Sequence, residues 1–317
     1  MIALLRCFVL AGCFALGTTG CQSTRTAAPD GTQPSSNADS LELPAFSKIL
    51  RLGRPLREIS GLAASPTKAG ILWAVADSGN PPDLHAIRPD GSTAGRVRVE
   101  GARNRDWEDL AAFTYRGRSY LLVADVGDNR GRRRDCRLYF IPEPDPTAIS
   151  CVPEVSCQIA YTDRPHDCEA VAVDVARDAI YLASKEEGRS RIYLTSLSGA
   201  FGGGVRTAKP VGLVPLELRG APMGLGKLAR HASFGQTACG MALDRTSGAA
   251  YLLSYTHLYR LTAGDLATNL APGDRKLIAY PSLYQAESVA VPAWDRRGIW
   301  IASEGKAGGS LVRIPRR

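Results

Sequence analysis

The segment Trp107-Glu108-Asp109-Leu110-Ala111 carries the pattern that decides the fold. Four other segments share its apolar fourth residue and its alanine in fifth place: Ile59-Ser60-Gly61-Leu62-Ala63, Cys168-Glu169-Ala170-Val171-Ala172, Ala238-Cys239-Gly240-Met241-Ala242 and Ala286-Glu287-Ser288-Val289-Ala290. The copies recur at intervals of 48, 61, 70 and 48 residues. A repeat of this length is typical of a protein built from one supersecondary unit used several times.

Each copy is followed by two further short segments rich in β-branched and aromatic residues and bounded by turn residues, which is the composition of strands. The second segments are Trp73–Asp77, Leu121–Asp125, Ile180–Ser184, Ala250–Ser254 and Ile299–Ser303. The third segments are Leu84–Ile87, Leu138–Ile141, Ile192–Leu194, Leu258–Leu261 and Leu311–Ile314. Each unit also has room for an outer strand, such as Gly95–Val99 or Lys276–Tyr280.

Four strands in each unit predict an all-β protein, a β-propeller of five four-stranded blades. The 70-residue interval leaves room for a sixth blade. The chain stops soon after the third strand of its last unit, so we expect the N-terminal strand Ile49–Gly53 to complete that blade and close the ring. The alternative, a β-sandwich, does not repeat one three-strand pattern five times.

The N-terminus predicts export. Residues 1–20 read as a signal sequence, with Arg6 before an apolar stretch, and residues 18–21 (Thr-Thr-Gly-Cys) resemble a bacterial lipobox ending at Cys21. Cleavage at Cys13 would leave almost no apolar stretch, and an ordinary cleaved signal is the other alternative. Residues 21–44 are expected to form a lipid-bearing flexible linker, and residues 45–317 the propeller. Since Gln22 follows the cysteine, resemblance to sorted lipoproteins predicts the periplasmic face of an outer membrane.

Composition excludes several classes of protein. The chain of 317 residues has no apolar run long enough for a membrane-spanning helix, and a net charge of +8 does not by itself imply nucleic-acid binding. Four histidines and no Cys-x-x-Cys disfavour a zinc site. Of the five cysteines beyond Cys21, we expect Cys136, Cys151 and Cys157 to supply one disulfide, since they are close in sequence.

The predicted topology gathers acidic residues at one mouth of the central channel. The first strand of a blade starts on the face where the second strand ends, so residues at those two positions should meet near the axis. Clustered carboxylates repel one another and need a cation, a basic partner or protonation, and oxygen ligands favour Ca²⁺ or Mg²⁺. The predicted metal ligands are Asp106, Glu108, Asp109, Asp125, Asp128, Asn129, Glu169 and Glu287.

The same loops carry basic and polar residues that suit a small anionic ligand. The predicted ligand-binding residues are Asp77, Arg130, His166, Asp167, Lys185, Tyr255 and Glu304. Two alternatives stay open: the acids cap turns through their own backbone, or they pair with arginine and lysine and only hold the blades together. No catalytic residue is assigned, because nucleophile-elbow, Walker and dinucleotide motifs are missing.

Residues 58–62 (Glu-Ile-Ser-Gly-Leu), 75–79 (Val-Ala-Asp-Ser-Gly), 106–111 (Asp-Trp-Glu-Asp-Leu-Ala) and 167–170 (Asp-Cys-Glu-Ala) resemble the SdiA-regulated and phytase-like (esterase-like) propellers. Members of that group are envelope or secreted propellers, several with bound calcium. The resemblance implies that Glu108, Asp109 and Glu169 lie at the metal-binding face. The glycine that follows the family's motif glutamate is replaced here by Asp109 and Ala170, which weakens a phytase interpretation.

Three functions follow from these observations. The first is a lipid-anchored module that holds a divalent cation and recognises a small anionic ligand or an envelope protein. The second is a calcium-dependent hydrolase of phosphoesters or other esters. The third is a protein-interaction scaffold without catalysis. The first is preferred, because ligands can be named and a nucleophile cannot.

Overall fold

Residues 45–216, 236–271 and 273–316 are described here in a computed structural model of the chain. They form an all-β domain with only short helical turns, η1 (Arg54–Leu56), α1 (Leu197–Ala200) and η2 (Asp265–Ala267). No helix among them is long and apolar enough to cross a membrane. The predicted signal sequence, Cys21 and the linker up to residue 44 lie outside the described residues.

Each copy of the repeat supplies the first strand of an antiparallel sheet, and the following segments add strands outward. One sheet has the order β2 (Ile59–Ala64), β3 (Leu72–Ala76), β4 (Asp83–Ile87), β5 (Thr93–Val99) and β9 (Ser150–Cys151). Another has the order β15 (Ala238–Leu243), β16 (Ala249–Ser254), β17 (Leu258–Thr262) and β18 (Lys276–Ile278). A third has the order β19 (Ala286–Ala290), β20 (Gly298–Ser303), β21 (Ser310–Pro315) and β1 (Ile49–Arg51).

The remaining strands form one continuous eight-stranded sheet. Its first half is β6 (Trp107–Tyr115), β7 (Arg118–Asp125), β8 (Arg137–Pro142) and β10 (Val155–Tyr161). Its second half is β14 (Gly204–Pro215), β13 (Arg189–Ser196), β12 (Ala179–Ser184) and β11 (Cys168–Asp174). The halves join because β10 and β14 pair in parallel, with Cys157 opposite Gly204. The sequence repeat did not predict this joint, which lies at the outer edge where the repeat is weakest.

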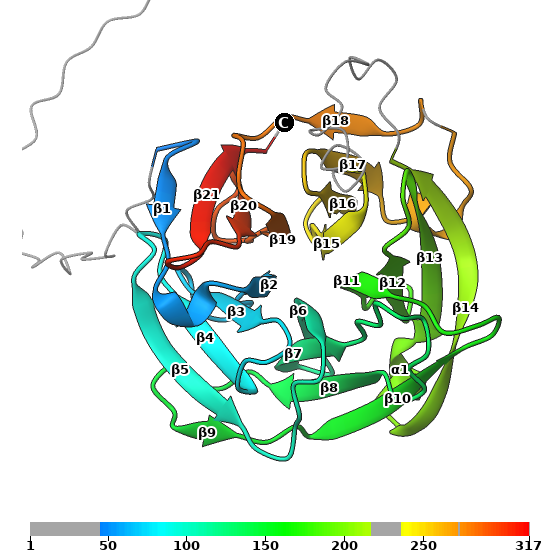
Figure 1. Ribbon diagram of the computed structural model, residues 1–317. Coiled ribbons are helices and arrows are strands. Elements are labelled where there is room, and N and C mark those ends of the chain that lie inside the picture. The colour runs from blue at the N-terminus through cyan, green and yellow to red at the C-terminus, as the bar shows by residue number, and fades with distance from the viewer. Residues whose placement is uncertain (1–44, 217–235, 272, 317) are drawn as a thin grey trace, which may run out of the picture. The chain divides into compact units, whose positions relative to one another are not determined.

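The sheets are arranged around a common axis (Figure 1). Their innermost strands contact one another in a cycle: β2 with β6, β6 with β11, β11 with β15, β15 with β19, and β19 with β2. Radial sheets around an axis define a β-propeller, as the repeat predicted.

The N-terminal strand completes the last sheet. β1 pairs antiparallel with β21, with Ile49 opposite Val312 and Arg51 opposite Ser310. This confirms the predicted closing strand, which ends at Arg51. Pairing between the two ends of the domain covers the edge of β21 and ties the first and last parts of the domain together.

The core consists of apolar clusters between adjacent sheets, with Trp73, Trp107 and Trp300 among its largest buried side chains. The predicted disulfide is not formed, since all five described cysteines are free thiols. Cys151 lies on β9, which pairs with β5, whereas Cys157 lies on β10 beside β8 and β14. Cys151 and Cys157 are therefore in different sheets, whereas Cys136 and Cys157 pack in the same core cluster as free thiols.

Candidate metal and ligand site

Every innermost strand contains a β-bulge at the same place, two residues into the repeat. On β6 the register passes from Trp107 opposite Asp125 to Asp109 opposite Ala124, so Glu108 is the extra residue. The equivalent extra residues are Ser60, Glu169, Cys239 and Glu287. A bulge re-aims side chains that regular alternation would place on opposite faces.

Two of the bulged residues bond to the next strand of the ring. The Ser60 hydroxyl donates to the carbonyl of Trp107 at 2.6 Å, and the Cys239 thiol donates to the carbonyl of Ala286 at 2.9 Å. Both acceptors immediately precede the next bulged residue. A carboxylate has no proton to give in this way, so the glutamates at the equivalent positions do something else.

Glu108 lies at the centre of an acidic cluster formed by the starts of β6 and β11 and the end of β3. One carboxylate oxygen each from Asp77, Asp106 and Glu108 lie within 4.8 Å of one another. The same holds for Glu108, Asp167 and Glu169. The structure thus joins carboxylates from three consecutive repeats of the sequence pattern into a group that is able to hold a metal ion.

Room for the cluster comes from Gly127, just after β7. A Cβ atom at this position would lie 2.0 Å from Glu108 Oε1 and 2.6 Å from Asp106 Oδ2. The glycine is needed for space, because the carboxylates occupy the volume that any side chain would fill. Its amide also donates to the Asp106 carbonyl at 3.2 Å, which holds the two segments together.

Glu108 is a buried acid inside this cluster. Its exposed fraction is 7%, and no hydrogen bond to its carboxylate is found among the described residues. Burial raises the pKa of Glu108 well above its usual value, and the carboxylates of Glu169, Asp77 and Asp106 raise this pKa further. A buried acid in this state favours either a proton or a bound cation.

Lys185 offsets part of this charge. Its ammonium group lies 2.9 Å from Glu169 Oε1 and 5.9 Å from the centre of the Tyr255 ring. Burial nevertheless raises the pKa of Glu169 to about 7, although Lys185 opposes the shift. Five carboxylates against one ammonium leave the cluster strongly negative when ionised.

Glu287 and Glu304 extend the acidic region toward β19 and β20. Burial raises the pKa of Glu287 well above its usual value, and Glu169 adds to the effect. Burial also raises the pKa of Glu304 to about 7, with Asp77 and Glu58 adding to it. Neither residue is among the groups that lie within 4.8 Å of one another in the described structure.

Asp125 and Asp128, two predicted metal ligands, bind Arg133 instead. The Arg133 guanidinium lies 2.8 Å from Asp125 Oδ1 and also donates to the Gly127 carbonyl at 2.7 Å. The Arg133 amide donates to Asp128 Oδ2 at 2.6 Å. Asp128 in turn donates its amide to Asp167 Oδ1 at 2.6 Å. These two acids therefore shape the loop beside the cluster and lie outside it.

Asp109 has a separate role as the second residue of its bulge. Its Oδ2 accepts from the amides of Val171 at 2.7 Å and Met241 at 3.2 Å, and its Oδ1 accepts from Leu110 at 2.8 Å. Burial raises the pKa of Asp109 well above its usual value, while the three amides oppose that shift. Asp109 thus links β6 to β11 and β15, and it lies apart from the acidic cluster.

Beside the cluster is an arginine-rich hollow of about 500 Å³. Its walls come from the start of β6 and the connection from β7 to β8, and they include Arg105, Asp106, Asp128, Asn129, Arg130, Arg132, Arg133, Arg134 and Asp135. Arg105 pairs with Asp135, and Arg133 pairs with Asp125. The structure shows no ion pair for Arg130, Arg132 or Arg134 among the described residues. Free guanidinium groups beside an acidic cluster suit an anion.

His166 does not face the hollow. It is buried, with Nε2 3.0 Å from Asp163 Oδ2, and it also hydrogen-bonds the Tyr193 hydroxyl. Its ring lies 4.6 Å from the Tyr193 ring and 5.3 Å from the Tyr161 ring. These contacts make His166 part of the packing between β10, β11 and β13.

Comparison with known proteins supports the fold. No protein-family model matches the chain, and no curated protein matches it in sequence. The allergen Mala s 1 of Malassezia sympodialis is similar in structure, with a TM-score of 0.51 and 11% identity, over 85% of this chain and 96% of that chain.

Two enzymes are more distant structural neighbours. A gluconolactonase from Xanthomonas campestris has a TM-score of 0.41 and 14% identity, over 87% of this chain and 92% of that chain. A luciferin-regenerating enzyme has a TM-score of 0.45 and 11% identity, over 85% and 95% of the two chains. At these identities the likeness concerns the fold alone, and the resemblance to the SdiA-regulated and phytase-like group stays a prediction.

The sequence pattern undervalued two members of the site. Asp77 and Asp167 were expected to contact a ligand, yet they lie in the acidic cluster itself. Arg133 is one of four arginines in residues 130–134 of the sequence. Only its contacts with Asp125, Gly127 and Asp128 distinguish it from the other three. A signal for Asp167 did exist, because Asp106 and Asp167 both precede the repeat by the same number of residues.

Proposed function

We propose that the chain is a five-bladed propeller that binds a divalent cation, most simply Ca²⁺, through Asp77, Asp106, Glu108, Asp167 and Glu169. The observation that carries this proposal is Glu108, a buried carboxylate that lies among other carboxylates and accepts no hydrogen bond from any residue that the structure describes. The donors are all oxygens, which suits Ca²⁺ or Mg²⁺ better than zinc. When bound, the cation would offset part of the negative charge of the cluster and would itself be a positive centre that a ligand can contact.

We further propose that this ligand is a small anion. The hollow shares Asp106 with the cluster, and Arg130, Arg132 and Arg134 add positive charge to its walls. One anionic group of the ligand would face the cation while the guanidinium groups bind another part of it. Anchoring at Cys21 to the periplasmic face of an outer membrane, as the sequence predicts, would place this site in the cell envelope.

Calorimetric titration tests the cation site. The purified protein, first stripped with a chelator, should bind one Ca²⁺ per chain, and Glu108→Gln should weaken this binding by at least about tenfold. Gly127→Ala should have a similar effect, because its methyl group needs the space of the Glu108 carboxylate. Glu100→Gln, at an exposed position, is the matched control. Unchanged affinity in Glu108→Gln would refute the site.

Membrane fractionation tests the anchor separately. Cys21→Ala should move the protein from the membrane fraction to the soluble fraction. Retention in the membrane fraction would contradict the lipid anchor, and it would leave the cation site untouched.

A hydrolase is the second candidate, favoured by Glu304. Partial burial and the carboxylates of Asp77 and Glu58 raise the pKa of Glu304 to about 7, and a general base is most effective near the working pH. A panel of phosphoesters and carboxylic esters with Ca²⁺ tests this function. Turnover that is lost in both Glu304→Gln and Glu108→Gln would support it, and an inert panel would leave the binding function as the better account.

A further inference from the structure

The opposite end of the channel forms a second cavity, lined by apolar side chains and by the polar residues Ser65, Asp244, Arg245 and Thr246. The inner strands run away from the acidic cluster, and their far ends surround a cavity of about 70 Å³. Its lining includes the alanine that ends every copy of the repeat: Ala63, Ala111, Ala172, Ala242 and Ala290. Each alanine lies two residues after the second residue of its bulge, as Ala111 follows Asp109 on β6. Because side chains along a strand alternate between its two faces, each alanine points toward the axis of the propeller. The five small side chains keep this end of the channel open.

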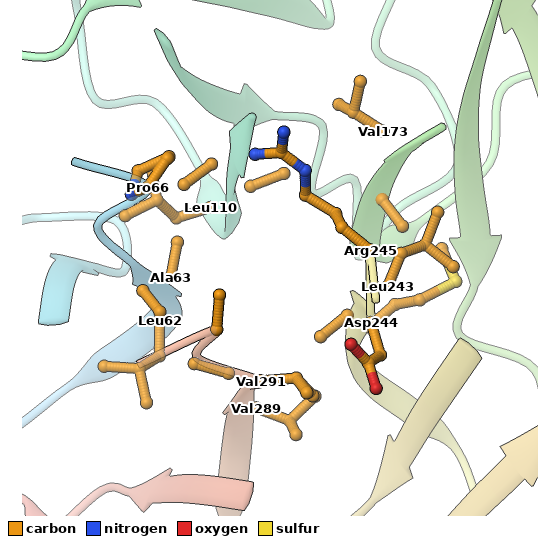
Figure 2. A pocket seen from close by; sticks show the side chains of 18 of the residues that line it. Leu62, Ala63, Pro66, Leu110, Val173, Leu243, Asp244, Arg245, Val289 and Val291 are labelled. Carbon is orange, nitrogen blue, oxygen red and sulfur yellow. The ribbon is translucent and has the colours of Figure 1, made fainter. Parts of the chain in front are cut away.

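Apolar walls enclose the space between the alanines. Figure 2 shows Leu62, Leu110, Val289 and Val291 around the opening. Asp109, which spans from β6 to the amides of Val171 and Met241, lies on the strand just before Leu110. The cavity and the acidic cluster are therefore separate sites at the two ends of the inner strands.

One arginine lines the mouth of this cavity. Arg245, just past the end of β15, extends its guanidinium toward the strand that carries Leu110 (Figure 2). Among the described residues its one hydrogen bond is a long one, 3.4 Å to the Thr114 hydroxyl. An exposed guanidinium held this weakly is available to donate hydrogen bonds to a carboxylate.

The acids nearby do not compete for Arg245. Asp244 Oδ2 lies 3.0 Å from Arg316 Nη1, and its carboxylate points away from the Arg245 guanidinium in Figure 2. Asp174 pairs with Arg177 at 2.7 Å. The rim thus combines satisfied acids with one available cation over an apolar cavity.

We propose that this far mouth binds a small carboxylic acid with a short branched aliphatic tail. The carboxylate would pair with Arg245, and the tail would enter the alanine-lined cavity. A cavity of 150 Å³ accommodates benzene, so 70 Å³ suits a group of about three carbons, such as isopropyl. The small volume of the cavity and the Arg245 side chain at its mouth exclude a folded partner or a long acyl chain.

Ligand-observed NMR and calorimetry with isovalerate test this proposal. We expect saturable binding with a Kd on the order of 1 mM. Isovaleramide, which has the same tail without the charge, and acetate, which has the charge without the tail, should each bind at least about tenfold more weakly. Equal binding of isovaleramide, or no saturable binding of isovalerate at tenfold higher concentration, would overturn the proposal.

Two variants separate the cation from the cavity. Arg245→Gln, at an exposed position, should weaken isovalerate binding about tenfold, and Ala111→Leu should abolish it by filling the cavity. Arg177→Gln, an exposed arginine on the same face, is the control and should bind normally. Normal binding by Arg245→Gln would refute the assignment even if Ala111→Leu failed to fold. Binding should be unchanged in a chelator, which distinguishes this site from the cation site.

Discussion

The five bulges of the inner ring are alike in backbone and differ in side chain. At β2 and β15 the extra residue is Ser60 or Cys239, which donates to a carbonyl of the next inner strand. At β6 and β11 it is Glu108 or Glu169, which meets other carboxylates instead. The serine and cysteine show that the bulge itself needs no acid, so the acids at β6 and β11 are an addition to the fold that burial makes costly.

This difference separates two kinds of residue within one ring. Ser60 and Cys239 stabilise contacts between strands, whereas the bulged glutamates lower stability unless a cation or a proton compensates them. Four experiments test that separation, taken here from the largest expected effect to the smallest.

Asp109→Ala should have the largest effect, a loss of about 3–5 kcal/mol in the free energy of unfolding, because three buried amides lose their acceptor. Urea denaturation measures this. Asp90→Ala, at an exposed turn, should cost far less. A loss below about 1 kcal/mol for Asp109→Ala would show that Asp109 does not hold the inner strands together.

Calcium should stabilise the protein in a pH-dependent way. Glu169 has a pKa of 4.5 as a free side chain and about 7 in the fold, so between these values the folded state holds more protons than the unfolded state. Without metal, the free energy of unfolding therefore falls as pH rises through this window. Calcium at about 100 times its Kd should add about 2.7 kcal/mol at pH 7.5 and much less at pH 5. Thermal denaturation with and without a chelator measures this, and an equal gain at both pH values would contradict it.

Glu108→Gln should raise the stability of the metal-free protein at pH 7.5 by about 1–2 kcal/mol, because it removes a buried charge from like charges. The same variant should lose the calcium effect. Denaturation in a chelator gives the comparison with the unchanged protein. A less stable variant would mean that Glu108 stabilises the fold, as Ser60 and Cys239 do.

Ser60→Ala should have the smallest effect, a loss of about 1 kcal/mol, because one hydrogen bond to the Trp107 carbonyl disappears. Cys239→Ala should behave similarly through the Ala286 carbonyl. Neither variant should change calcium affinity. A large change in calcium affinity in either variant would contradict the distinction between the hydrogen-bonding residues, Ser60 and Cys239, and the bulged glutamates.

Part of this comparison was predictable from the sequence. The repeat located every inner strand and placed Glu108 and Glu169 in one column, and the closing strand followed from where the last unit stops. The bulges were not predicted, because an extra residue in a strand leaves no clear composition signal. The need for Gly127 and the use of Asp125 by Arg133 depend on contacts between segments, which spacing does not show.

The sequence by itself determined the propeller and the acidic end of its channel, because both follow from a local pattern repeated five times. Only the tertiary structure decided which acids meet, which are neutralised by arginine, and that Asp109 accepts three amides from three strands. The reason is physical: periodicity fixes the face on which a side chain lies, whereas distances of a few ångströms between sheets depend on how those sheets pack.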